Sequence, residues 1–346
     1  MKTIKKIIIF KNDRIGDLIP SVPAINLLIE NNKDKEIIIY LSEINYKMNF
    51  LFEYENVKII KVKYNLTYSN RIKLILFFLT NIISEVYIIR PKYFFFILPL
   101  LFFFKKTKYY ALCLNGKNNY RRPSIFFRKF LSKFIINDRE TQLIRPSRRE
   151  LQLELVDVNW KNKNIRNNYN FDLSNELKKI LPKEYCLIHY KKNVFEKLSW
   201  GKEGFLEILE NLKTYYPNII LINDIDGGDD NLFFKKRFDW FDFRNKDHIL
   251  KNNNILYFEN IDGLDLFNVV RLSKKTIACH GTITLLGNLV NTPILDLFNC
   301  DIKSRDDFYQ YKNSFHEHVP KNNYDFIIPS TDIKKTLRKM KFSIKK

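Results

Sequence analysis

Short apolar runs alternate with segments of helical period along the 346 residues of this chain. Residues 7–10 are uninterruptedly apolar, which is typical of a strand that is covered on both faces. A helical period follows, with intervals of four, three and four between Leu18, Val22, Ile25 and Ile29. Strands that alternate with helices form parallel α/β sheets, whose ligands bind at the carboxyl ends of the strands.

The same alternation organises both halves of the chain. In the first half it predicts a helix at residues 71–83 and further strands at 37–41, 57–62 and 86–89. A polar stretch at 161–170 then interrupts the pattern, and we place the domain boundary there. The second half predicts helices at 205–212 and 332–340, and strands at 186–190, 218–222, 255–258, 276–279 and 294–298. We therefore expect an α/β fold of two Rossmann-like domains, 1–168 and 169–328, that face a central cleft, with a basic helix or tail at 329–346.

The strongly basic charge of the chain predicts an acidic partner. The formal net charge is +21, which suits nucleic acid, a phosphorylated lipid or sugar, or a membrane surface. The alternative is a solvated surface in a lysine-rich composition. The four cysteines are far apart in the sequence, which argues against a disulfide framework or a structural zinc site and fits a reducing cytoplasm.

Two apolar segments are short. Residues 7–10 are too few for a signal peptide, and residues 94–104 fall below the roughly 20 residues that span a bilayer. Lysines at positions 92, 105, 106 and 108 flank the longer segment. We expect it to dock on an anionic membrane surface, the alternative being an ordinary core helix.

The first candidate site follows the first predicted strand. Residues 11–17 read KNDRIGD, where Gly16 permits a close approach of the backbone at the turn and Asp17 stands at the start of the helix. Asp17 is either a functional carboxylate or a helix cap that contributes about 1 kcal/mol.

Two turns of the second half have features of an anion site. Lys192, Asn193 and Lys197 follow a predicted strand, where lysines hold a diphosphate or are simply exposed. Residues 279–284 read CHGTIT at a later turn of the same kind, after the strand predicted at 276–279. A glycine and hydroxyl residues at a helix N-terminus offer backbone N–H groups and the helix dipole to a phosphate. We expect His280, Gly281, Thr282 and Thr284 to bind it; alternatively Thr282 is an N-cap and His280 a satisfied polar residue.

Two further groups of charged residues are candidates. Lys117, Arg121 and Arg122 lie in a basic, aromatic-rich stretch, and arginine forks suit the phosphate or carboxylate groups of an acceptor. A solvated basic helix is the alternative. Asp224 and Asp226 form an Asp-x-Asp pattern, which we interpret as a solvated turn and not as a metal site.

Together these motifs resemble glycosyltransferase family 9, the heptosyltransferase-like enzymes of lipopolysaccharide core assembly. The resemblance extends over residues 5–300. It rests on the RIGD motif at 14–17 with Pro20 and Pro23, on Lys197 near Trp200, on the glycine turn at 281, and on TPILDL at 292–297. The turn departs from the family's Asp-Thr-Gly-x-x-His: Cys279 replaces the acidic residue, His280 stands at the threonine position, and Thr284 replaces the final histidine.

The resemblance implies a GT-B fold with the acceptor in the first domain and the nucleotide donor in the second. It also implies an inverting transfer that requires no metal and no cofactor. By position, Asp17 corresponds to the general base, Lys197 to the lysine that binds the donor phosphate, and residues 280–284 to the donor loop. We assign Arg14 to the acceptor.

We therefore predict a glycosyltransferase that is peripheral on the inner, cytoplasmic face of the cytoplasmic membrane. It moves a sugar, heptose being one candidate, from a nucleotide sugar to a phosphorylated or acidic glycolipid, of the lipopolysaccharide type or another lipid-linked or cell-surface glycan. Two alternatives are a dinucleotide-dependent oxidoreductase and a basic nucleic-acid-binding protein. The first lacks a G-x-G-x-x-G motif and the second a stacking platform or recognition helix, so we expect no nucleic-acid partner.

Overall fold

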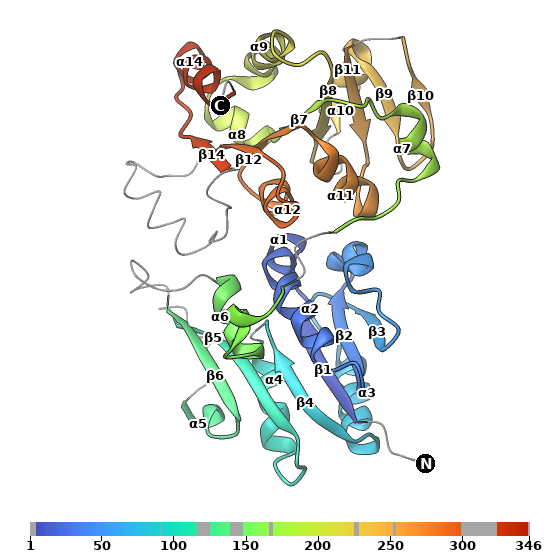
Figure 1. The fold of residues 1–346 in the computed structure, drawn as a ribbon, viewed down its shortest axis with the longest axis vertical. Coiled ribbons are helices and arrows are strands. Elements are labelled where there is room, and N and C mark those ends of the chain that lie inside the picture. Colours follow the sequence, from blue (N-terminus) through green and yellow to red (C-terminus); the bar gives the residue numbers. More distant parts are fainter. Residues whose placement is uncertain are drawn as a thin grey trace. The chain divides into compact units, whose positions relative to one another are not determined.

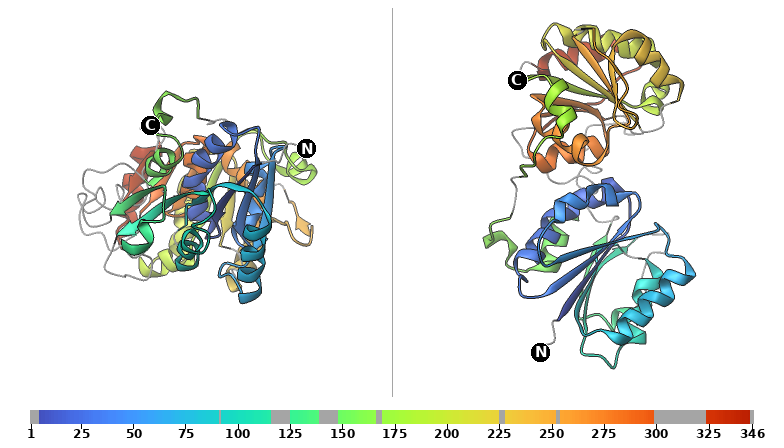
Figure 2. Two further views of the ribbon diagram at one scale, coloured as in Figure 1. Left: turned by 90° about the horizontal axis from the view of Figure 1, so that it is seen from below. Right: turned by 90° about the vertical axis from the view of Figure 1, so that its right-hand side faces the viewer.

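The computed structural model describes residues 5–90, 92–115, 125–138, 148–165, 169–224, 228–251, 254–298 and 324–344. The chain divides into two compact units, and the change from the first to the second falls at residues 166–167 (Figure 1). Each unit has its own sheet, with helices on both faces (Figure 2).

The first unit is built on a six-stranded parallel sheet of order β3-β2-β1-β4-β5-β6. This is the order of a doubly wound Rossmann sheet, in which β1 lies at the centre. The apolar run at 7–10 is completely buried in β1, as its composition predicts. The strands are β1 (Lys6–Lys11), β2 (Glu36–Ser42), β3 (Val57–Val62), β4 (Ile83–Ile88), β5 (Lys108–Asn115) and β6 (Lys133–Asp138).

Helices cover both faces of this sheet. One face carries α2 and α6, which pack through Ala24, Leu27 and Leu153; side chains of α3 and α4 join β1, β2 and β4 in a separate core. The segment at 18–29 is helical but changes type, because Pro20 and Pro23 are each the second residue of a new helix, where a missing N–H is tolerated. The helices are α1 (Ile15–Leu18), η1 (Ile19–Ser21), α2 (Val22–Glu30), η2 (Asn45–Phe52), α3 (Tyr68–Thr80), α4 (Tyr93–Leu101), α5 (Ile125–Arg128), α6 (Arg148–Val156) and η5 (Trp160–Asn162).

The second unit has an eight-stranded sheet of order β10-β9-β11-β8-β7-β12-β13-β14. All its pairings are parallel except that of β10 with β9. The strands are β7 (Cys186–Tyr190), β8 (Ile219–Asn223), β9 (Asp239–Asp242), β10 (His248–Ile249), β11 (Ile255–Glu259), β12 (Lys275–Cys279), β13 (Ile294–Leu297) and β14 (Tyr324–Ile327). The helices are α7 (Asn175–Ile180), α8 (Lys192–Lys197), α9 (Gly201–Lys213), α10 (Asp229–Arg237), α11 (Gly263–Leu272), α12 (Thr282–Val290) and α14 (Ile333–Ile344).

Helix α9 shows why the periodic segments fold as predicted. Phe205, Ile208, Leu209 and Leu212 recur at helical spacing, and all four are buried against the sheet. Trp200 precedes the helix, is buried, and donates its indole N–H to the backbone oxygen of Thr331 at 3.0 Å. The tryptophan thereby ties the start of α9 to the segment before α14.

Several features of the fold differ from the prediction. The helix expected at 71–83 ends at Thr80, and Ile83 already belongs to β4. A strand that the sequence did not predict, β14, pairs in parallel with the strand expected at 294–298 and forms the edge of the sheet. The C-terminal helix does not stand apart as a tail, because α14 packs into the second core through Met340. Among the described residues, no helix combines the length and apolarity needed to cross a bilayer.

Candidate active site

The first cluster lies at the turn between β1 and α1. Arg14 is the N-cap of α1, with extended backbone angles, and the backbone N–H of Asp17 donates to its carbonyl oxygen at 3.0 Å. Asp17 is therefore the third residue of the helix, so the alternative that it is the cap is wrong. Arg14 itself is exposed. The Asp17 side chain is partly exposed, at 27%, as a carboxylate that meets a substrate must be.

Asp17 is held by an arginine that the sequence analysis did not single out. Nη1 of Arg90 lies 3.4 Å from Oδ2 of Asp17, and Nη2 donates to the Tyr64 hydroxyl at 3.5 Å. Arg90 is the second residue after β4 and is buried. Because β1 and β4 are neighbours in the sheet, their carboxyl ends bring the two side chains together across 73 residues of sequence. The ion pair restricts the orientation of the carboxylate.

A buried network of polar residues holds the backbone at Lys11 and Asp13, just before the turn that carries Asp17. Lys11 and Asp13 form an ion pair with an Nζ–Oδ2 distance of 2.6 Å, and both side chains are 0% exposed. The Asn45 amide donates to the Lys11 carbonyl oxygen at 2.7 Å and to Oδ1 of Asp13 at 3.2 Å. The Ser42 hydroxyl donates to the Asp13 carbonyl oxygen. A buried pair persists when such hydrogen bonds satisfy its remaining groups, so the network fixes the backbone that leads to Asp17.

The second cluster, in the second unit, centres on the turn between β12 and α12. Gly281 is the N-cap of α12, with φ +153° and ψ −144°. Only glycine adopts such angles readily, so this position requires glycine for its backbone conformation. Thr282 is the first residue of the helix, and the alternative that it is the N-cap is therefore wrong.

A buried aspartate organises the side chains of that turn. Asp296 lies on β13 beside β12, and it accepts hydrogen bonds from Nδ1 of His280 at 2.6 Å and from the Tyr324 hydroxyl at 3.0 Å. Because a carboxylate only accepts, Nδ1 of His280 bears the proton, and a neutral ring has its lone pair on Nε2. Burial, together with the charge of Asp296, raises the pKa of Tyr324 well above its usual value, so its hydroxyl stays a donor.

Thr284 does not take the place that the sequence predicted for it. Its side chain is buried, and its hydroxyl lies 3.4 Å from Oδ1 of Asp296. A residue that binds a donor must be reachable from outside, which Thr284 is not. The partly exposed residues of this turn are His280, Gly281 and Thr282.

The lysine that reaches this turn is Lys191. Its ammonium donates to the His280 carbonyl oxygen at 3.3 Å, and a Cβ on Gly281 would stand 3.7 Å from the same nitrogen. The predicted Lys192, Asn193 and Lys197 are exposed on α8. Nζ of Lys192 lies 3.9 Å from the carboxylate of Glu196 in the same helix. Their role in donor binding stays a prediction.

A second histidine–aspartate pair lies on the neighbouring strands. Nε2 of His189 is 3.2 Å from Oδ1 of Asp224, where β7 and β8 end. Burial alone would raise the pKa of Asp224, but the hydrogen bond from His189 and the charges of His189 and Lys191 outweigh it and lower that pKa. The carboxylate thus stays ionised. Asp226, Lys117, Arg121 and Arg122 lie outside the described residues.

A metal site is not evident in the part of the chain that the structure describes. No group of three or more His, Cys, Asp or Glu residues there is placed to hold an ion. A transfer that needs no metal or cofactor stays a prediction. The thiols of Cys186 and Cys279 are fully buried, and burial raises the pKa of both, so neither is a reactive nucleophile.

Solved structures of similar architecture cover nearly the whole chain. No protein-family model matches the sequence, and no curated protein matches it significantly. The Escherichia coli heptosyltransferase WaaC with ADP has a TM-score of 0.62 at 10% identity, covering 98% of this chain and 99% of its own. The E. coli ADP-heptose lps heptosyltransferase II has a TM-score of 0.60 at 12% identity, with 98% of each chain covered.

A structure with another described activity is also similar. A putative UDP-N-acetylglucosamine 2-epimerase from Listeria monocytogenes has a TM-score of 0.57 at 11% identity, covering 99% of this chain and 89% of its own. At such identities the likeness concerns the fold, which hosts more than one reaction. The two Rossmann-like units predicted from the sequence, and their GT-B architecture, are confirmed.

Proposed function

We propose that the chain is an inverting glycosyltransferase that moves a sugar from a nucleoside-diphosphate donor to a lipid-linked or cell-surface glycan. The observation that carries the proposal is the partly exposed Asp17 carboxylate, held by Arg90 at the carboxyl edge of the first sheet. A fold shared with two heptosyltransferases supports it. Heptose is one candidate sugar, and a divergent membership of glycosyltransferase family 9 accounts for the motifs.

The donor is assigned to the second unit. A diphosphate is attracted to the start of α12, where Gly281 leaves the backbone N–H groups accessible and the helix dipole is positive. The ammonium of Lys191 adds a full charge beside that turn. The neighbour WaaC was solved with ADP and with ADP-2-deoxy-2-fluoro heptose, which are ligands of this chemical class.

The reaction is a single displacement. Asp17 accepts the proton of an acceptor hydroxyl while that oxygen attacks the anomeric carbon, and the bond from the sugar to the diphosphate breaks. Arg90 positions the carboxylate and does not itself meet the substrate. Lys191 and the Gly281 turn stabilise the charge that develops on the departing diphosphate.

Binding measurements test the function first. We expect one class of nucleotide sugar to raise the melting temperature, because a ligand at 100 times its Kd stabilises the native state by about 2.7 kcal/mol. The panel contains ADP-, UDP-, GDP- and CMP-sugars, with NADPH and a single-stranded oligonucleotide for the two alternative functions. Stabilisation by NADPH or by the oligonucleotide alone would overturn the proposal. Product analysis separates transfer from epimerisation.

Variants of the turn locate the donor. Lys191→Ala removes a charge-assisted contact, and Gly281→Val places a β-branched residue at φ +153°, so we expect each to weaken donor binding about 10- to 150-fold by calorimetry. Lys213→Ala is the control, because Lys213 pairs with Glu210 on the exposed side of α9. Lys197→Ala tests the role that the family resemblance gives to Lys197. Unchanged affinity in Lys191→Ala and Gly281→Val would place the donor elsewhere.

The predicted membrane-docking run is mostly core. Phe95, Phe96 and Leu98 of α4 and the following Phe102 are buried against the first sheet. For most of residues 94–104 the structure thus favours the alternative, an ordinary core helix. Three residues at the end of the run, Leu101, Phe103 and Phe104, are exposed.

Helix α3 supplies a larger apolar surface beside that end. Ile72, Leu76 and Leu79 form a stripe at helical spacing and are 43%, 54% and 50% exposed. Lys105 joins the two regions, since its ammonium donates to the carbonyl oxygens of Phe78, Leu79 and Asn81 at the end of α3. We define the α3 surface as Tyr68, Ile72, Leu76, Leu79, Ile82, Leu101, Phe103 and Phe104, all of them exposed.

The α3 surface suits an anionic bilayer. Exposed cations accompany it at Arg71, Lys73, Lys106 and Lys108. An apolar face edged by basic residues binds at the headgroup boundary, and each basic residue near such a surface contributes about 1 kcal/mol. A patch of this kind on a protein that met only water would be unusual. We therefore assign the membrane partner to this surface.

Flotation with liposomes tests the assignment. We expect the protein to float with anionic vesicles at low salt, and far less with neutral vesicles or at high salt, because salt screens surface attraction. The double variant Leu76→Glu with Phe103→Glu should bind anionic vesicles at least about tenfold more weakly. Leu232→Glu with Ile249→Glu is the matched control, at exposed apolar residues of the second unit. Equal flotation of both double variants would contradict the assignment.

A further inference from the structure

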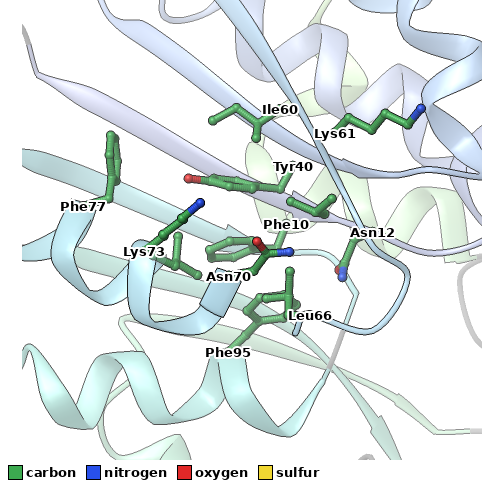
Figure 3. A pocket seen from close by; sticks show the side chains of 12 residues that line it. Phe10, Asn12, Tyr40, Ile60, Lys61, Leu66, Asn70, Lys73, Phe77 and Phe95 are labelled. Carbon is green, nitrogen blue, oxygen red and sulfur yellow. The ribbon is translucent and has the colours of Figure 1, made fainter. Parts of the chain in front are cut away.

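A cavity of about 250 Å³ opens in the first unit between the sheet and the inner side of α3. Figure 3 shows the rings of Phe10, Tyr40 and Phe95 gathered around it, with Ile60 on one side. Leu74 and Phe77 of α3 complete much of the apolar lining. An apolar cavity of about 150 Å³ accommodates a benzene ring, so by the same ratio this one has room for about ten carbon atoms.

One polar atom in the lining lacks the partner that burial demands. Asn12 is completely buried, and its amide nitrogen donates to the Tyr64 carbonyl oxygen at 3.2 Å. Its Oδ1 is also buried, and within the described residues it accepts no hydrogen bond. Buried carbonyl oxygens without a donor are rare, because their desolvation is uncompensated. Because Asn12 is one of the residues that line the cavity, its Oδ1 is the acceptor that a ligand's donor would meet after a small rotation of the side chain.

The charged residues of the lining are all basic. Lys61 and Lys73 line the cavity and are exposed, and no acidic residue is among the residues that line it. Nζ of Lys61 lies 5.5 Å from the centre of the Tyr46 ring, whereas Lys73 extends from α3 (Figure 3). A ligand that fills the apolar space thus meets a positive charge where it emerges into solvent.

We infer that this cavity binds the apolar end of an anionic amphiphile, a chain of about ten carbon atoms that carries a hydroxyl or another hydrogen-bond donor. The chain lies among the aromatic and branched side chains, the donor bonds Oδ1 of Asn12, and the anionic group lies by Lys73. Burying the chain supplies most of the affinity, because apolar area is removed from water.

Hydrogen bonds through Tyr64 link one residue of the cavity lining, Asn12, to the candidate active site. The Tyr64 carbonyl oxygen accepts from Asn12 and from Lys92, and the Tyr64 hydroxyl accepts from Arg90, which holds Asp17. The amphiphile is therefore the lipid part of the acceptor, and this assignment rests on the proposed function. The binding of a chain in the cavity does not depend on it.

Calorimetry with three small probes tests the binding. The probes are 10-hydroxydecanoate, decanoate, which lacks the donor, and decane-1,10-diol, which lacks the charge, each kept below the concentration at which it aggregates. We expect 10-hydroxydecanoate to bind once per chain and about 3- to 10-fold more tightly than decanoate, as one hydrogen bond to a buried acceptor contributes. Lys73→Ala should weaken it about 2- to 5-fold and leave the diol unaffected.

A variant that fills the cavity provides the decisive test. Ile60→Trp adds a bulky ring from a partly buried edge strand and should weaken 10-hydroxydecanoate more than tenfold. Ile249→Trp makes the same substitution at an exposed isoleucine of the second unit and should leave binding unchanged. Circular dichroism and melting temperature establish that both variants fold. Absence of binding, or equal binding in Ile60→Trp and the unmodified protein, overturns the inference, and decanoate binding as tightly as 10-hydroxydecanoate overturns the role of Asn12.

A kinetic measurement links the cavity to the acceptor. If the acceptor's lipid occupies it, 10-hydroxydecanoate raises the KM for the acceptor and leaves kcat and the KM for the donor unchanged. Binding without such competition keeps the cavity as a site for a free amphiphile and refutes its assignment to the acceptor. Failure of every nucleotide sugar to bind would sink the proposed function and leave the probe titrations intact.

Discussion

Asp17→Asn should lower the rate of glycosyl transfer by about 10²- to 10⁴-fold at saturating donor and acceptor, which is the usual contribution of a general base. Asparagine has nearly the shape of aspartate but accepts no proton from the acceptor hydroxyl. Donor affinity should change little, because the donor is assigned to the second unit. The measurements are steady-state kinetics and a donor titration of the same preparation.

Two further measurements, the stability of Asp17→Asn and the kinetics of Arg90→Lys, check that the loss of rate arises from the missing base. Asp17→Asn should cost only about 1–3 kcal/mol of stability, because the asparagine oxygen still accepts from the buried Arg90 and only the charge is lost. Arg90→Lys keeps the charge but loses the fork that reaches both Asp17 and Tyr64, so a smaller loss of kcat with a changed pH profile is expected. Near-normal turnover in Asp17→Asn would reduce the residue to a favourable charge at a helix N-terminus.

Much of the fold follows from local sequence. A run such as 7–10 has no polar residue to face solvent, so it is recognisable as a central strand, and the spacing of Phe205, Ile208, Leu209 and Leu212 fixes one buried face of α9. Strand β14 has only four residues, YDFI, and becomes a strand by pairing with β13. That pairing joins segments distant in the sequence, so no local pattern predicts it.

In the candidate site, too, the features set by local sequence were predicted and those set by contacts between distant segments were not. Asp17 and Gly281 were found because turn chemistry is local: a glycine or a carboxylate beside a helix start is visible in the sequence. Arg90 and Asp296 were missed because strand order brings them to the site, β4 beside β1 and β13 beside β12. A charged residue within or directly after an apolar strand was the available signal for both.

Position along a helix explains the remaining misassignments. Thr284 shares a sequence motif with Thr282, but two residues turn a side chain by more than half a helical turn, and Thr284 faces the buried Asp296. In the run at 94–104, a uniformly apolar composition conceals which residues face the core. The packing of α4 against the sheet buries Phe95 and Phe96, whereas Phe103 and Phe104 follow the end of the helix and are exposed.

The buried ion pair of Lys11 and Asp13, which precedes Asp17 in the chain, should make a large contribution to the stability of the first unit. Asp13→Ala leaves the Lys11 ammonium buried without its carboxylate, and breaking such a pair costs about 3–5 kcal/mol. We expect a loss of that size in the free energy of unfolding, measured by urea denaturation. Glu36→Ala is the control, since its pair with Lys6, at 2.9 Å, is partly exposed and should contribute less than about 1 kcal/mol.

A double variant shows whether the Lys11–Asp13 pair stabilises the protein or whether the loss in Asp13→Ala arises only because one charge is left buried without the other. Lys11→Met with Asp13→Leu replaces both charges by apolar side chains, so no uncompensated charge stays buried, and this protein should be more stable than Asp13→Ala. The amide of Asn45 would then lose its bond to the Asp13 carboxylate but keep the one to the Lys11 carbonyl oxygen. If the double variant is stable yet transfers sugar slowly, the pair acts by placing the turn that carries Asp17. A loss below about 1 kcal/mol in Asp13→Ala would show that the pair does not stabilise the turn at all.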